Sequence, residues 1–153
     1  MDPERFNIND LLPHEAPMML LHKLTQVDKT TATCQAIVKR DCIFLDDQGQ
    51  LPATVGIEWM AQTIAVHAGY LDLSSGRPIS LGYLLGTRQY RCTRSTLHVG
   101  EQFNIHVEEL FKGNGMASFQ CTISQDSEVV IEAAINTYQP EITGGSAHGD
   151  SRV

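Results

Sequence analysis

The chain has 153 residues, and its 11 Lys and Arg against 18 Asp and Glu give a formal net charge of −7. This length suits one domain, and a content of 42% hydrophobic residues is typical of a globular protein. The acidic total, without a Lys/Arg-dense block or a glycine-rich phosphate loop, argues against binding of nucleic acid or nucleotide. No apolar run approaches the roughly 20 residues that span a bilayer, so we expect no membrane insertion.

Cysteine and histidine spacing argues against a metal centre. The four cysteines contain no Cys-x-x-Cys pair, and no pair of histidines has metal-ligand spacing with an acid, so we predict neither a metal nor a cofactor. Residues 1–6 carry acids where a signal peptide has a basic and then an apolar stretch. We therefore expect reduced thiols in a cytoplasmic protein.

The first half of the chain predicts a hairpin followed by one long helix. A short helical turn is expected over residues 9–13, and strands over Met18–Asp28 and Thr31–Val38. After a polar turn, apolar residues at three-and-four spacing predict a helix from Val55 to about Leu71, with Thr54 as its N-cap. This helix carries apolar residues on most faces, which is typical of a central helix.

The second half predicts an antiparallel meander. Turn signals separate four strands: Ser80–Thr93, Gln102–Phe111, Ala117–Gln125 and Glu128–Tyr138. About six strands and one long helix give an α+β domain over residues 1–140 in which a curved sheet wraps the helix. Residues 141–153 are polar and rich in glycine, so we expect a flexible tail there.

Glu58 is an acid in the first turn of an otherwise apolar helix segment. A buried carboxylate is costly unless it is paired or protonated, so this position is a candidate for catalysis. The structural alternative is that Glu58 only favours the positive end of the helix dipole. The sequence leaves both readings open.

Two motifs give the chain a family resemblance. Leu11-Leu-Pro-His-Glu-Ala-Pro-Met18 resembles the opening of the FabZ-type 3-hydroxyacyl-(acyl carrier protein) dehydratases, and Gly56-Ile-Glu-Trp-Met-Ala-Gln62 resembles their central-helix signature. The similarity covers roughly residues 8–140 and implies the hotdog fold. In that family the active site lies across a dimer interface, with a histidine from one subunit and the helix acid from the other.

The family's catalytic histidine is missing from this chain. The family spacing, counted back from Glu58, falls on Phe44, while Pro52 and Ala53 match a Pro-Gly pair whose glycine N–H holds the thioester carbonyl. A chain with the acid but no histidine is most similar to the ApeP-like subunit of heterodimeric aryl-polyene dehydratases. The resemblance implies that Glu58 is catalytic and that the Ala53 N–H remains a possible oxyanion donor.

Other residues have weaker candidate roles. Gln62, one turn beyond Glu58, can orient that carboxyl or the substrate, or simply pack in the helix. Arg88, Arg91 and Arg94 form either a solvated strand end or a basic rim that receives an acidic acyl carrier protein.

The leading hypothesis is a dehydratase subunit of fatty-acid or polyene synthesis, acting on carrier-bound 3-hydroxyacyl thioesters as a hotdog homodimer or with a histidine-bearing partner. An acyl thioesterase is the second, because other hotdog proteins hydrolyse thioesters with a single helix carboxylate. A non-catalytic subunit that only completes its partner's fold is the third.

Overall fold

The computed structural model describes residues 1–12, 18–80 and 82–140. Its elements, in chain order, are α1 (Ile8–Leu11), β1 (Lys23–Val27), β2 (Thr31–Ile37), β3 (Gln50–Pro52), a 3₁₀ turn (Ala53–Val55), α2 (Gly56–Ser74), β4 (Tyr83–Cys92), β5 (Thr96–His98), β6 (Gln102–Gly113), β7 (Met116–Gln125) and β8 (Glu128–Tyr138).

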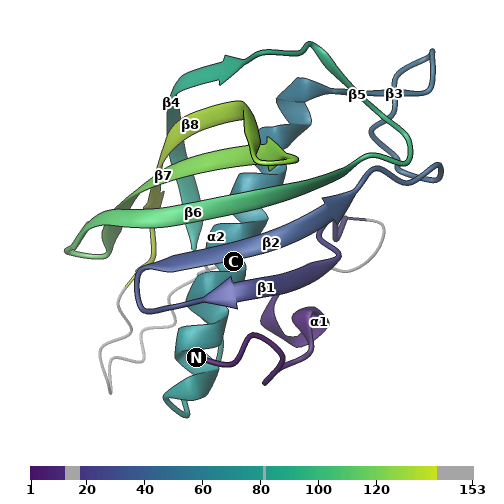
Figure 1. Cartoon of the computed structure of the whole chain (residues 1–153). Coiled ribbons are helices and arrows are strands. Elements are labelled where there is room, and N and C mark those ends of the chain that lie inside the picture. The colour runs from purple at the N-terminus through teal and green to yellow at the C-terminus, as the bar shows by residue number, and fades with distance from the viewer. Residues whose placement is uncertain (13–17, 81, 141–153) are drawn as a thin grey trace.

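Six strands form one antiparallel sheet in the order β1-β2-β6-β7-β8-β4, so β1 and β4 are its two edges. The sheet curls around α2, which lies along its concave side (Figure 1). The short strands β3 and β5 pair with each other next to the start of α2. This arrangement confirms the α+β hotdog fold expected from the sequence.

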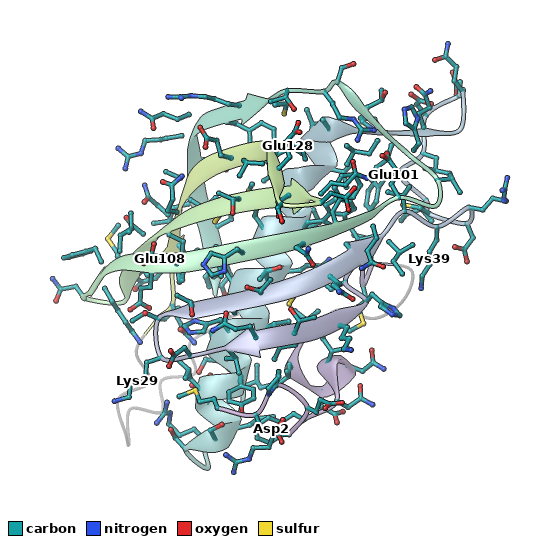
Figure 2. The ribbon with its side chains drawn as sticks, in the orientation of Figure 1. Asp2, Lys29, Lys39, Glu101, Glu108 and Glu128 are labelled. Carbon is teal, nitrogen blue, oxygen red and sulfur yellow. The ribbon has the colours of Figure 1, made fainter. Side chains whose placement is uncertain are left out.

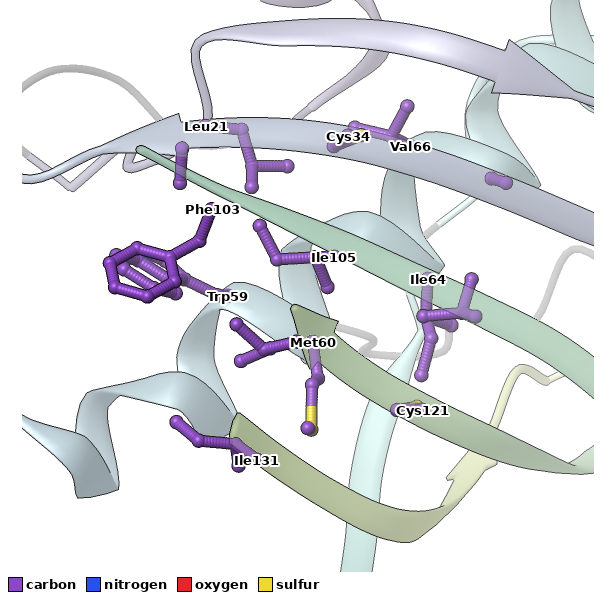
Figure 3. Close-up of a cluster of buried hydrophobic side chains, with 14 of the residues drawn as sticks. Leu21, Cys34, Trp59, Met60, Ile64, Val66, Phe103, Ile105, Cys121 and Ile131 are labelled. Atoms are coloured by element: carbon purple, nitrogen blue, oxygen red, sulfur yellow. The ribbon is translucent and has the colours of Figure 1, made fainter. Parts of the chain in front are cut away.

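The core lies between α2 and the concave face of the sheet. On β2, alternate residues Ala32, Cys34 and Ala36 are fully buried, and each pairs with a larger buried residue of β6. Small side chains opposite large ones let the curved sheet approach the helix closely. Trp59 of α2 packs against Phe103 of β6 with ring centroids 5.6 Å apart, at one end of this cluster (Figure 3).

The central position of α2 is confirmed, but its start differs from the expectation. A 3₁₀ turn over Ala53–Val55 precedes the helix, which begins at Gly56 and continues to Ser74. Thr54 is therefore not the N-cap; Val55 occupies that position and its side chain makes no capping hydrogen bond. The N–H of Gly56 donates instead to the carbonyl oxygens of Ala53 and Thr54 in the 3₁₀ turn.

The predicted hairpin and the four later strands are present, with shifted ends. The largest difference is at the first strand, because residues 18–22 precede β1 and are not part of it. The prediction of a tail over residues 141–153 lies outside the described residues. Within the described part of the chain, no helix has the length and apolar character needed to cross a membrane.

Candidate active site

Glu58 is the third residue of α2 and its side chain is half-buried. The next two residues, Trp59 and Met60, are buried in the core, so the helix is anchored immediately beside the carboxyl group. Glu58 accepts a hydrogen bond from the Nε2 atom of Gln62, one turn further along, at 3.2 Å. The first turn of a helix also carries the positive end of its dipole, which favours an acid there.

Gln62 is fully buried, and both the nitrogen and the oxygen of its carboxamide form hydrogen bonds. Besides Glu58, its Nε2 donates to the carbonyl oxygen of Met18 at 2.6 Å, and its Oε1 accepts from the N–H of Leu20 at 2.9 Å. Because one amide end faces acceptors and the other faces a donor, the orientation of this carboxamide is fixed by its surroundings. Gln62 therefore orients one oxygen of Glu58 and also holds residues 18–20 against α2.

Ala53 is buried at the start of the 3₁₀ turn, and both of its backbone polar groups have partners. Its N–H donates to the carbonyl oxygen of Ser95 at 2.9 Å, and its carbonyl oxygen accepts from the hydroxyl of Tyr90. The N–H considered as an oxyanion donor is thus engaged in joining β3 to the segment before β5. In this structure Ala53 has a structural role.

The three arginines of the expected basic rim have different environments. Arg94 is half-buried and forms a two-pronged ion pair with Glu101, with Nη–Oε distances of 2.6 and 3.0 Å. Glu101 lies just before β6 (Figure 2). Arg91 is exposed and lies 3.5 Å from Glu132 of β8, while Arg88 is exposed on the same strand. Arg94 therefore belongs to an ion pair within the chain, whereas Arg88 and Arg91 lie at the surface of β4.

The histidines of the described residues are directed to other partners or to solvent. His67 lies about 180° around α2 from Glu58, as nine residues at 100° each require. Its Nε2 bonds the carbonyl oxygen of Asp28 at 2.9 Å, and burial lowers its pKa below the usual value. His106 bonds Thr33, and His22 and His98 are exposed. His14, in the first motif, lies outside the described residues.

A cavity of about 680 Å³ lies along α2; Glu58 is not one of its lining residues, whereas His67 is. Its helical wall begins one turn after Glu58 with Ala61 and continues through Ala65 and Ala68 to Asp72. The eleven steps from Ala61 to Asp72 rise about 16 Å along the helix axis, and the volume is in the ordinary range for small-molecule sites. The opposite wall is formed by residues at the open edge of the sheet, including Leu84 of β4, and by Phe119 of β7.

Solved structures related to this chain share the fold. A chain of the dehydratase heterocomplex ApeI:P from Xenorhabdus doucetiae is 36% identical, with a TM-score of 0.84, and the match covers 89% of this chain and 92% of that one. A hypothetical thioesterase with coenzyme A from Streptococcus pneumoniae is 11% identical, with a TM-score of 0.61 and coverages of 76% and 84%. The zebrafish thioesterase superfamily member 2 is also 11% identical, with a TM-score of 0.60 and coverages of 78% and 80%.

The two thioesterases support the hotdog fold and no more, because their identity is so low. No curated protein matches the chain significantly. The model of the ApeP-like family, described as ApeP dehydratase, matches residues 6–147, which include the helix acid, its glutamine and the cavity wall. The chain therefore belongs to the ApeP-like dehydratase family.

Proposed function

We propose that this chain supplies the acid of a composite dehydratase site, and that the substrate is a 3-hydroxyacyl thioester carried by an acyl carrier protein. The observation that carries the proposal is the half-buried carboxyl of Glu58, oriented by the fully buried Gln62 about one turn before the cavity along α2 begins. A carboxyl held in this way near a cavity suits acid–base catalysis on a bound acyl chain.

The reaction needs two groups. One removes a proton from the carbon next to the thioester carbonyl, and the other helps the hydroxyl on the following carbon to leave as water, so that a double bond forms between the two carbons. We assign the second task to Glu58. We assign the first to an imidazole of a partner chain, because His67 and His106 in this chain are engaged elsewhere.

The proposed partner is a second, histidine-bearing hotdog chain. The structurally similar ApeI:P is named as a heterocomplex, and β4 offers a free edge on which another sheet can continue. Two leucines of this strand, Leu84 and Leu85, are 47% and 53% exposed. Proteins normally cover a long apolar edge strand, which favours pairing at β4.

The cavity is the proposed site of the acyl chain. Ala61, Ala65 and Ala68 lie on the same side of α2 as Glu58, and we place the thioester end of the chain at the Ala61 end of the cavity, towards Glu58. Arg88 and Arg91, exposed on β4, are the proposed contacts for an acidic carrier protein. The cytoplasmic location stays a prediction, supported by the four free thiols.

The test is product analysis with a 3-hydroxyacyl carrier thioester. The chain is co-expressed with a histidine-bearing hotdog partner, and each chain alone and the purified complex are assayed by mass spectrometry. The proposal expects an enoyl thioester, lighter by one water, from the complex and very little from this chain alone. Release of free carrier thiol with an intact hydroxyacid would instead indicate a thioesterase. Full activity of the partner alone would indicate a non-catalytic subunit.

A further inference from the structure

Strand β4 contains a bulge that directs Tyr90 toward the start of α2. Arg88 and Arg91 pair with residues two positions apart on β8, so β4 has one extra residue in this interval. Gln89 accommodates the bulge with a φ of 55°, in the left-handed region that non-glycine residues seldom adopt. Bulges occur beside active sites, where they redirect a side chain. Here the redirected side chain is Tyr90, which is half-buried although it lies on an edge strand.

The hydroxyl of Tyr90 bridges the two sides of the helix start. It donates a hydrogen bond to the carbonyl oxygen of Ala53, in the 3₁₀ turn. Its oxygen also lies against Gly56, the first residue of α2, where an added Cβ atom would clash with it. The N–H of Gly56 donates to the carbonyl oxygens of Ala53 and Thr54, so Tyr90 and the start of α2 share the carbonyl of Ala53 as an acceptor. Tyr90 therefore ties the start of α2 to a neighbouring strand.

Gly56 provides the space for this contact. A Cβ atom at residue 56 would lie 2.5 Å from the hydroxyl oxygen of Tyr90, and 3.0 Å from the side chains of Ile123 and Ile131. The absence of a side chain at Gly56 is what lets the phenol reach the backbone. Burial raises the pKa of the Tyr90 phenol, so the group keeps its proton and remains a donor throughout the physiological range.

We propose that Tyr90 is a positioning residue for Glu58: it holds the first turn of α2 from the bulge in β4 and so fixes the carboxyl relative to the substrate. Glu58 lies two residues after Gly56, so any loosening of this turn moves the acid. The proposal deepens and rests on the proposed function, since it assumes that the position of Glu58 matters for dehydration. A displacement of a catalytic group by about 1 Å can cost up to about 100-fold in rate.

The experiment compares Tyr90→Phe with Tyr138→Phe, which removes a hydroxyl from a tyrosine that is 38% exposed on β8. In the complex with the partner, at a temperature where both variants are folded, Tyr90→Phe should lower kcat by about 10-fold and change KM by less than about two-fold. Tyr138→Phe should behave as the wild type. A purely structural Tyr90 would lower the unfolding temperature and leave kcat of the folded complex unchanged, which would overturn the proposal.

Hydrogen exchange provides a readout that does not depend on activity. The backbone amides of residues 53–58 should exchange faster in Tyr90→Phe than in the wild type, and at the wild-type rate in Tyr138→Phe. Unchanged exchange in Tyr90→Phe would overturn the proposal whatever the kinetics. A wild-type complex without dehydratase activity would refute the proposed function alone, and the exchange rates would still decide whether Tyr90 holds this turn.

Gly56→Ala gives a second approach to the same contact. Its methyl group should push the Tyr90 hydroxyl away and so reproduce the fall in kcat. In the Tyr90→Phe background this methyl group no longer meets a hydroxyl, so the further loss should be smaller than in the wild type. Equal losses in both backgrounds would count against the bridging role of the hydroxyl.

Discussion

Replacing Gln62 with Met tests whether one buried carboxamide organises the site. The two side chains have similar volumes, so the substitution removes the hydrogen bonds without leaving a large cavity. Three bonds are lost: those to Glu58, to the carbonyl oxygen of Met18 and from the N–H of Leu20. At about 1 kcal/mol net for each, the free energy of unfolding should fall by about 3 kcal/mol. For a domain of this size that is roughly 6–12 °C in Tm.

The assay is urea unfolding followed by circular dichroism, at one protein concentration for all variants because self-association would change the apparent stability. Gln102→Met is the matched control, since Gln102 is exposed at the start of β6 and its replacement should change stability by less than about 0.5 kcal/mol. Equal stabilities of Gln62→Met and Gln102→Met would refute the view that this carboxamide holds residues 18–20 on the helix.

Two further predictions concern stability. Gly56→Ala should cost about 1–3 kcal/mol through overpacking against Tyr90, whereas Gly86→Ala, whose added Cβ would have no atom within 4 Å, should cost far less; thermal unfolding of the pair decides this. The hydrogen bonds from Arg94 hold the pKa of Glu101 at about 2, below its ordinary value near 4.3. The stabilisation is therefore present above about pH 5 and is lost as the pH falls toward 2, so wild type and Glu101→Gln should differ most at neutral pH and converge in acid. A difference that does not depend on pH would contradict this assignment.

The sequence predicts the long elements well because their signals are local. Strands β6, β7 and β8 are separated by turns at Asn114 to Gly115 and at Asp126 to Ser127, and all four turn residues have positive φ in the structure. Such residues mark hairpins from sequence alone. Strands β3 and β5 have only three residues each, too few to show a period of two, and they were not predicted.

The contacts around Glu58 are less visible in the sequence because they are long-range. The apolar run that begins at Met18 reads as a strand, but its backbone is bound by a side chain 42 to 44 positions later. The sequence does not indicate where the side chain of Tyr90 points either, because the bulge at Gln89 interrupts the alternation of inward and outward side chains along β4. Glu58 stands out in the sequence as an acid in an apolar helix segment, and Gln62 stands out as the residue one turn later; their hydrogen bond matches the orienting alternative for Gln62.

The most direct test of the account is the kcat of the assembled complex with Glu58→Gln. The substitution keeps the size and hydrogen-bonding ability of the side chain while removing its acid–base chemistry. We predict that kcat falls by about 10²- to 10⁴-fold with assembly intact. Loss of the partner's histidine should cost a similar factor, and the double variant should be scarcely worse than either single one because the two groups act as a unit. A Glu58→Gln complex with full activity, or losses that multiply in the double variant, would contradict the composite site.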